Sequence, residues 1–381
     1  MAATAKSASS KSAGKSASKP SASKPAAKSA DKSSSDAVPP IGVHGAAQLP
    51  GIEVTSYNLE VKDKDGFVGD KASGRAFRAF VHDWRTKLRE IGKDPFEEDL
   101  DAHISKKTMD KVLAGDPEGA AVVHGAIEDF ARNFAYVAKR FLAQKDWEGV
   151  ERIVVGGGLS DSRVGAVAVA RANALLVADD VKVPLELLRH HPDEGGLIGC
   201  LHLAPSWIFS GYDGIIAVDI GGSNIRCGMV RHNAEKDAEL KKADVCRFEL
   251  WRHADEDKLS RTAAVERVVK MIKGLITQAE TDKLKVAPFI GIACPGLIND
   301  DGSIARGAQN LPGKWDSDHF LLPEEVRKAI PAIGEHDTMV VMHNDAVIQG
   351  LSARPWMGKT KKWAALTIGT GLGNACYRNR E

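Results

Sequence analysis

Short apolar runs recur along this chain, and each one stops at glycine or at a polar residue. Runs of this kind, bounded by turn-forming residues, are typical of strands that are buried on both faces. They predict strands at 153–155, 215–218, 340–342 and 364–368. Because polar or glycine-rich segments follow these strands directly, we expect the candidate functional residues at the strand ends.

A second pattern, with apolar residues three or four positions apart, predicts two amphipathic helices. One stripe consists of Phe77, Phe80, Val81, Trp84, Leu88 and Ile91, and the other of Ile127, Phe130, Phe134, Val137 and Phe141. Such spacing places the side chains on one face of a helix. We interpret both stripes as core rather than as contacts with a cofactor, and the mixture of strands and helices predicts an α/β chain.

The strand at 215–218 leads into a loop that is suited to bind phosphate groups. The segment D-I-G-G-S-N-I-R begins at Asp219. Gly221 and Gly222 allow backbone angles closed to other residues and let a polyphosphate approach the amide groups closely. Ser223 and Asn224 add polar donors, and Asp219 is placed to hold Mg²⁺ directly or through water. The alternative interpretation of this short motif is a β-hairpin turn.

A second candidate phosphate loop follows the last predicted strand. It consists of Gly369, Thr370 and Gly371, a glycine-rich turn that carries a hydroxyl group. Two other turn-rich segments, which contain Gly296 and Asn310, are predicted as loops at strand ends.

The strand at 340–342 delivers polar residues at its C-terminal end, namely Asn344 and Asp345. The carboxylate of Asp345 is a candidate catalytic group. Its alternative role is a helix N-cap, because the apolar residues within 346–351 are typical of the start of a helix.

Taken in this order, the motifs between Gly214 and Asn374 resemble those of the ROK family of sugar kinases and regulators, within the actin, hexokinase and Hsp70 ATPase superfamily. The resemblance implies an α/β fold of two lobes, each with a ribonuclease-H-like sheet, that close over a cleft. It also implies ATP and Mg²⁺ as cofactors and a small sugar as substrate. In that family the two phosphate loops grip the ATP phosphates from opposite sides.

The resemblance assigns roles to the remaining polar residues. Gly296 and Asn310 would contact the sugar, Asp345 would be the general base, and Asn344 would orient that base or the sugar. Phosphoryl transfer depends mainly on positioning and charge neutralisation. A carboxylate therefore suffices as base, since it need only remove the proton as the hydroxyl oxygen bonds to phosphorus.

The order of the segments departs from that of the family. The family's domain continues beyond the second phosphate loop, whereas only seven residues follow Asn374 here. Upstream, the strand at 153–155 runs into Gly156, Gly157 and Gly158, which resemble the family's adenosine-binding loop. A Rossmann dinucleotide site is the alternative, but the G-x-G-x-x-G spacing is not met.

This order predicts a circular permutation. Residues 41–203 correspond to the family's C-terminal half, and 214–381 correspond to its N-terminal half. Residues 204–213 would form a linker, packed on the surface, that joins the old chain ends. Such a cut is tolerated where the old ends lie close together and the new ends are exposed.

Two motifs of the family, the sugar-binding E-x-G-H and the zinc-binding cysteine cluster, are not found in this chain. The nearest candidate for the first is Glu53, with a solvent-exposed strand end as its alternative. The five cysteines are scattered without the spacing of zinc ligands, and His190 and His191 precede Pro192 in a polar loop. We therefore predict no structural metal.

Composition limits the partners. The chain has 381 residues, a hydrophobic content of 43% and a formal charge of +1, which gives no reason to expect a specific nucleic acid or a membrane. Unclustered cysteines in an odd number fit a cytoplasmic protein. Nothing in the sequence argues for or against a homo-oligomer.

The first 40 residues differ from the rest. They consist almost entirely of Ala, Ser, Lys and Pro, with seven lysines and two acidic residues. Such a segment cannot bury a core and is predicted to be a disordered tail. A solubilising extension and a contact with nucleic acid or an acidic partner are the two interpretations of its charge.

Three functions remain in competition. The leading hypothesis is ATP-dependent transfer of the γ-phosphate to a hydroxyl group of a hexose or amino sugar. The second is a sugar-responsive regulator, although the helix-turn-helix that such family members carry is not provided by the tail. The third is a pseudokinase that binds nucleotide or sugar without turnover. Both phosphate loops and Asp345 favour the enzyme, whereas the missing E-x-G-H favours an altered substrate or lost activity.

Overall fold

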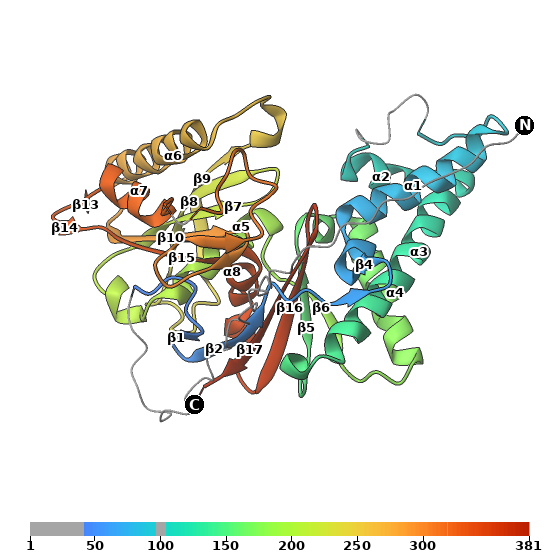
Figure 1. The fold of residues 1–381 in the computed structure, drawn as a ribbon, viewed down its shortest axis with the longest axis horizontal. Coiled ribbons are helices and arrows are strands. Elements are labelled where there is room, and N and C mark those ends of the chain that lie inside the picture. The colour runs from blue at the N-terminus through green and yellow to red at the C-terminus, as the bar shows by residue number, and fades with distance from the viewer. Residues whose placement is uncertain (1–41, 97–103, 318, 381) are drawn as a thin grey trace, which may run out of the picture. The chain divides into compact units, whose positions relative to one another are not determined.

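Two mixed β-sheets organise the chain in the computed structural model, which describes residues 42–96, 104–317 and 319–380 (Figure 1). The predicted tail at 1–40 lies outside the described residues. The predicted strands at 153–155, 215–218, 340–342 and 364–368 are all confirmed as sheet strands. No helix in the described part of the chain is long and apolar enough to cross a lipid bilayer.

The first sheet has five strands in the order β15-β10-β7-β8-β9. The strands β7, β8 and β9 pair with one another in antiparallel fashion, whereas β10 and β15 run parallel to β7 and to each other. Their bounds are Gly214–Ile220 for β7, Ile225–Arg231 for β8, Asp244–Trp251 for β9, Val286–Cys294 for β10 and Met339–Asn344 for β15.

The second sheet has six strands in the order β1-β2-β17-β16-β5-β6 and repeats the same pattern. Here β16, β17 and β2 are antiparallel, and β5 and β6 run parallel to β16. Their bounds are Gln48–Leu49 for β1, Ile52–Tyr57 for β2, Ile153–Gly156 for β5, Leu185–Leu187 for β6, Lys362–Ile368 for β16 and Leu372–Asn379 for β17. Three antiparallel strands followed by two parallel ones form the ribonuclease-H-like arrangement in both sheets.

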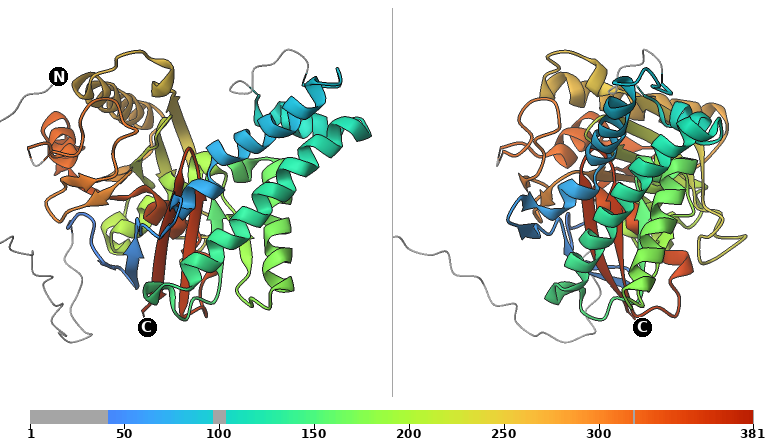
Figure 2. Two further views of the ribbon diagram at one scale, coloured as in Figure 1. Left: turned by 45° about the vertical axis from the view of Figure 1, so that its right-hand side comes forward. Right: turned by 90° about the vertical axis from the view of Figure 1, so that its right-hand side faces the viewer.

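Helices cover the outer face of each sheet and fill the space between the sheets. The second sheet is covered by α1 and α3, which Figure 2 shows crossing beside it, together with α2 and α4. The first sheet is covered by α6 and α7, and α5 and α8 lie between the two sheets. The bounds are Gly74–Arg89 for α1, Lys106–Leu113 for α2, Pro117–Leu142 for α3, Arg163–Ala178 for α4, Pro192–Gly199 for α5, Arg261–Thr281 for α6, Leu322–Ala329 for α7 and Asp345–Leu351 for α8.

The molecule has three apolar cores, one on the outer side of each sheet and one between the sheets. Each sheet contributes to two of them, because strand side chains alternate between its two faces. On β16, Ala364 and Leu366 face the helices of the second sheet, whereas Trp363 and Ala365 face the central layer. A third core lies between the first sheet and α6 with α7. Small two-stranded ribbons complete the fold at Lys62–Asp63 with Gly66–Phe67, Leu297–Ile298 with Ile304–Arg306, and Ala332–Ile333 with His336–Asp337.

The two helical stripes are confirmed as core, with one exception. The rings of Phe77 in α1 and Phe130 in α3 meet edge to face, with 5.5 Å between their centroids. Ile91 does not belong to the stripe, because α1 ends at Arg89 and the Ile91 side chain is 65% exposed.

In the linker predicted at 204–213, only some of the apolar residues pack against the rest of the protein. A short 3-10 helix at Ser206–Phe209 brings Phe209 against Phe289 of β10, with 5.7 Å between the ring centroids. Trp207, in contrast, is 65% exposed.

The C-terminal end of β17 meets the start of β2 in the second sheet. Asn379 of β17 lies opposite Ile52 of β2, and the amide of Arg380 donates to the carbonyl of Gly51 at 3.1 Å. The end of β17 therefore lies beside the start of β2, as in a hairpin whose turn is missing.

Candidate active site

Three parallel strands of the first sheet end at one edge and bring the first set of polar residues together. Ala293 of β10 lies opposite both Asp219 of β7 and His343 of β15, and Cys294 lies opposite Asn344. The carboxyl ends of parallel strands are where α/β folds bind ligands. The predicted residues after these strands therefore share one location.

Asp219 is buried at the end of β7 within a charged network. Its Oδ2 lies 3.5 Å from Nη1 of Arg226, which in turn bonds Asp193 at 2.6 Å. Burial raises the pKa of Asp219, and Asp193 acts in the same direction, whereas Arg226 opposes them. A Cβ atom at Gly196 of α5 would lie 2.6 Å from the Asp219 carboxyl carbon, so only glycine permits this approach.

The first candidate phosphate loop is tightly folded after β7. The amide of Gly221 donates to the carbonyl of Asn224 at 2.8 Å, and Nε2 of His253 lies 2.8 Å from the carbonyl oxygen of Gly221. Neither Gly221 nor Gly222 has a positive φ, so the expectation of unusual backbone angles is wrong. What glycine allows is close approach, since a Cβ atom at Gly222 would lie 3.2 Å from that of Asn310.

The second phosphate loop connects β16 with β17 and faces the first. The amide of Gly369 donates to the carbonyl of Gly371 at 2.9 Å, and the amide of Gly74 at the start of α1 donates to the carbonyl of Gly369 at 2.9 Å. The hydroxyl groups of Ser223 and Thr370 lie 3.2 Å apart. Two loops from different sheets, far apart in sequence, therefore meet.

The glycine triplet lies beside the second loop, because β5 pairs with β16 and Gly156 lies opposite Thr367. Gly157 has a φ of 89°, and a Cβ atom there would lie 2.4 Å from the Ile368 backbone, so glycine is required for both reasons. At Gly158 a Cβ atom would meet nothing within 4 Å. The triplet thus ends on an open surface beside the loop that contains Thr370.

Asn344 caps α8, which leaves Asp345 free of that role. The Asn344 side-chain oxygen accepts from the amides of Ala346 and Val347, and its Nδ2 donates to the carbonyl of Gly296 at 2.9 Å. The alternative that Asp345 is the N-cap is therefore wrong. Asp345 occupies the first turn, where its Oδ1 accepts from the Ala346 amide at 2.9 Å.

Burial, followed by the nearby charge of Asp219, raises the pKa of Asp345 to about 7. The same two carboxylates, together with burial, raise the pKa of the Cys294 thiol. Asp345 can consequently exist in both protonation states near neutral pH, which suits a general base.

The loop after β10 makes a close turn next to Asn344. Gly296 has a φ of 109°, and a Cβ atom there would lie 2.5 Å from the carbonyl oxygen of Arg306. A Cβ atom at Gly307 would lie 2.9 Å from Cα of Gly296 and 3.2 Å from Nδ2 of Asn58. The amide side chain of Asn58, at the end of β2, is thus beside the loop predicted to contact a sugar.

Comparison with known proteins agrees with this arrangement over part of the chain. The sequence profile of the ROK family matches residues 215–381. Over these residues the chain is similar to the ROK family. The glucokinase of Thermotoga maritima is 30% identical over 162 residues, which are 42% of this chain and 43% of the glucokinase, so the chain spans less than half of that relative.

A solved structure is also similar to this chain. It is the Lmo2764 protein of Listeria monocytogenes, described as a proposed N-acetylmannosamine kinase, with 24% sequence identity and a TM-score of 0.29. The match covers 44% of this chain and 48% of the other.

Glu53 is the one predicted residue that the structure does not bring to the ROK segment's site. It lies near the start of β2, opposite Arg378, and forms an ion pair with it at 2.8 Å. The candidate loops lie at the other end of these strands, where β17 begins at Leu372. Glu53 is thus a half-buried, ion-paired residue near a strand end, which is closer to the structural alternative than to a sugar contact.

Sequence reasoning missed Tyr57 and Asn58, which reach the ROK loops from the other end of β2. The Tyr57 hydroxyl donates to the carbonyl of Ile298 at 3.2 Å, and its ring meets His343 edge to face. The side-chain oxygen of Asn374 accepts a hydrogen bond from the amide of Leu59, the residue after Asn58, at 2.9 Å. The only signal in the sequence was that Tyr57 and Asn58 closely follow Glu53, the nearest candidate for the missing E-x-G-H.

The residues of this site fit a magnesium ion bound mainly by a nucleotide. Such an ion needs one or two protein carboxylates besides phosphate oxygens and water, and Asp219 lies at the start of the first loop. Among residues 42–96, 104–317 and 319–380, no three His, Cys, Asp or Glu side chains are grouped to hold a metal ion. The five cysteines are unpaired.

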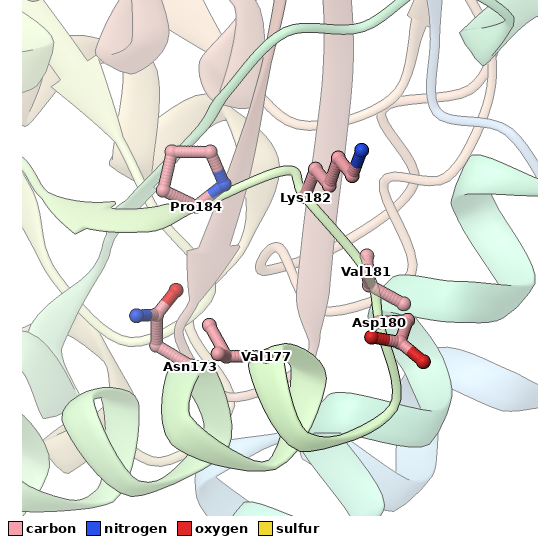
Figure 3. Close-up of a pocket in the computed structure, with 6 residues that line it drawn as sticks. All are labelled: Asn173, Val177, Asp180, Val181, Lys182 and Pro184. Atoms are coloured by element: carbon pink, nitrogen blue, oxygen red, sulfur yellow. The ribbon is translucent and has the colours of Figure 1, made fainter.

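A shallow pocket elsewhere on the second sheet's helical side contains none of the predicted site residues (Figure 3). It lies at the C-terminal end of α4 and is lined by Asn173, Val177, Asp180, Val181, Lys182 and Pro184.

Proposed function

We propose that this protein is an ATP-dependent kinase that transfers the γ-phosphate to a hydroxyl group of a sugar. The observation that carries the proposal is the meeting of the two phosphate loops at Ser223 and Thr370, beside the strand ends that hold Asp219 and Asp345. The relatives named as sugar kinases agree with it.

The two loops would hold the phosphates from opposite sides. Gly221 to Asn224 offer backbone amides and polar side chains on one side, and Gly369 to Gly371 offer them on the other. Asp219 would hold Mg²⁺, which neutralises charge on the phosphate oxygens when it is bound. The glycine triplet at 156–158, next to the second loop, would contact adenosine.

Asp345 would accept the proton of the sugar hydroxyl. Its raised pKa of about 7 makes it a stronger base than an exposed aspartate and leaves much of it ionised at neutral pH. Asn344 fixes the start of α8 and thus positions Asp345.

The sugar would lie against the turn formed by Gly296 and Gly307, within reach of Asn310 and Asn58. We propose a hexose or amino sugar, in line with the two named relatives. Asn58 replaces Glu53 as the contact from the second sheet, because it is the residue of β2's far end that lies beside Gly307.

We also propose that the domain is circularly permuted. Two features support the proposal. In the first sheet the equivalent strands follow in the order β7, β8, β9, β10 and β15, whereas in the second they follow as β16, β17, β2, β5 and β6. The end of β17 also lies beside the start of β2, where a hairpin turn would join the two strands. Residues 41–203, 204–213 and 214–381 would then be the rearranged segments.

The unpaired cysteines fit a reducing compartment, and we propose the cytoplasm as the location.

The test is an assay of ATP consumption over a panel of hexoses and amino sugars, beside the variant Asp345→Asn. Sugar-dependent turnover that falls by about 10²-fold or more in the variant supports the kinase. Nucleotide binding without turnover for any sugar would reject it in favour of a regulatory protein or pseudokinase.

A further inference from the structure

The first sheet ends in an unusually apolar edge strand, β9. No other strand of the described residues pairs with its outer edge. Phe248 and Leu250 of this strand are 44% and 42% exposed, and they are among the few large apolar side chains that face solvent. An exposed edge strand with apolar side chains is a template for pairing with another strand.

The two faces of β9 have different chemistry. Phe248 lies opposite Gly228 and Leu250 lies opposite Arg226, so both apolar side chains point to the face that α5 covers. Arg247 precedes Phe248, and Glu249 lies between Phe248 and Leu250. Both of these charged side chains point to the face of α6. Arg247 pairs there with Asp282 at 2.6 Å, and Glu249 pairs with Arg267 at 3.2 Å.

The sequence around Phe248 is self-complementary for antiparallel pairing. Residues 246–250 read Cys-Arg-Phe-Glu-Leu. If two copies pair with Phe248 opposite Phe248, each Arg247 faces Glu249 of the other copy on the α6 face. On the α5 face the two Phe248 rings meet, and each Leu250 is a diagonal neighbour of the other copy's Phe248.

Charge selects this register over its neighbours. A slip that centres the pairing on Arg247 places two arginines opposite each other, and one that centres it on Glu249 places two glutamates opposite each other. Like charges directly opposite in a sheet are destabilising. A bulge in the β8 and β9 pairing, near Val245 and Arg247, limits the regular strand on one side.

We propose that β9 binds β9 of a second copy of this chain, antiparallel and centred on Phe248, so that two first sheets join into one continuous sheet. The interface is isologous, since the same residues contribute from both copies. It does not depend on the proposed kinase activity, because β9 lies at the opposite edge of the sheet from β15, which leads to Asp345.

The test uses charge reversal in the full chain, followed by sedimentation velocity over a series of protein concentrations. Arg247→Glu alone places two pairs of glutamates opposite each other, and Glu249→Arg alone places two pairs of arginines. We expect each variant to self-associate about tenfold more weakly than the natural protein. A mixture of the two variants restores both opposite-charge pairs and is expected to form a heterodimer.

Lys359→Glu is the matched control, because it makes the same change of charge as Arg247→Glu at an exposed position that precedes β16 of the second sheet. It should self-associate like the natural protein, and thermal unfolding checks that all variants are folded. A natural protein that stays monomeric throughout the series overturns the proposal. So does a dimer that survives both reversals, or a mixture that associates no better than either variant alone.

Discussion

At the scale of single residues, Asp345 owes its chemistry to its neighbours. An aspartate in water is fully ionised at neutral pH and is a weak base. Burial and the charge of Asp219 raise its pKa to about 7, and both effects arise where β7 and β15 end at the same edge. Asn344 takes the capping bonds that would otherwise hold the carboxylate in a structural role.

A pH profile tests the role of Asp345 as base. The value of kcat/KM for the sugar should be constant above pH about 8 and fall tenfold per unit below pH about 7, because protonated Asp345 cannot accept a proton. The ATP concentration is kept saturating in the measurement. A profile that stays flat from about pH 6 to about pH 8 would contradict the assignment.

The same pKa predicts a dependence of stability on pH. The pKa of Asp345 in the folded state is raised above that of the unfolded chain, so its contribution to stability is fully present below the unfolded pKa and is lost as pH rises through about 7. Asp345→Asn should therefore stabilise the protein more at high pH than at low pH. Urea unfolding at about pH 5 and about pH 8 measures this; an equal effect at both would refute it.

The proposed contact of Asn58 with the sugar can be tested through the KM for the sugar. Its φ is 49°, a conformation that glycine also adopts, so Asn58→Gly removes the amide group without backbone strain. We expect KM for the sugar to rise about tenfold, as a hydrogen bond is lost, while KM for ATP is unchanged. Steady-state kinetics with each substrate varied in turn distinguish this from a general loss of activity, which would affect both.

At the scale of elements, the crossing of α5 and α8 determines how closely the two sheets approach. A Cβ atom at Gly199 of α5 would lie 1.8 Å from the carbonyl oxygen of Ile348 in α8. Gly196 of the same helix leaves room for Asp219. The small residues of α5 thus connect packing between the sheets with the position of a site residue.

Gly199→Ala tests this contact. The added methyl group meets backbone atoms that cannot rotate away, and we expect the free energy of unfolding to fall by about 2 kcal/mol or more. Gly195→Ala on the same helix is the control, since its nearest neighbour would be the Ser352 hydroxyl at 3.5 Å, an ordinary contact. Equal stabilities of the two variants by urea unfolding would show that the helices separate easily.

At the scale of the whole molecule, both sheets draw on distant parts of the chain. The second sheet places β17 between β2 and β16, so its strands come from both ends of the described sequence. The proposed permutation explains why the first candidate phosphate loop lies so late in the chain. It also explains why a family profile matches only the later segment, 215–381.

Rejoining the chain in the order of the family tests the permutation. The variant begins at Gly211, continues from residue 381 through a flexible linker to residue 42, and ends at Ser210, so that the cut is exposed and the buried Phe209 is kept. Because Arg380 already bonds Gly51, the new connection requires little rearrangement. Circular dichroism and urea unfolding should show a cooperatively folded protein within about 3 kcal/mol of the natural order. Failure to fold, with a soluble natural-order control, would contradict the proposal.

Much of the site was predictable because its residues lie at strand ends that local sequence identifies. An apolar run followed by glycines, as at Asp219 and Gly369, reflects a buried strand and a close turn, and both are local properties. Asn58 could not be found in this way. It reaches the site only because β2 pairs with β17, a strand more than 300 residues away in sequence.

The sequence by itself determined the strands, the two core-facing helical stripes and the glycine turns, because the spacing of apolar residues and the small size of glycine act over a few neighbouring positions. Only the tertiary structure decided that Ser223 meets Thr370, that Asn344 rather than Asp345 caps α8, and that Glu53 pairs with Arg378 away from the site. The first outcome depends on how the two sheets pack against each other, and the third depends on which strands become neighbours in a sheet. That choice is made by the burial of whole faces, which joins segments hundreds of residues apart.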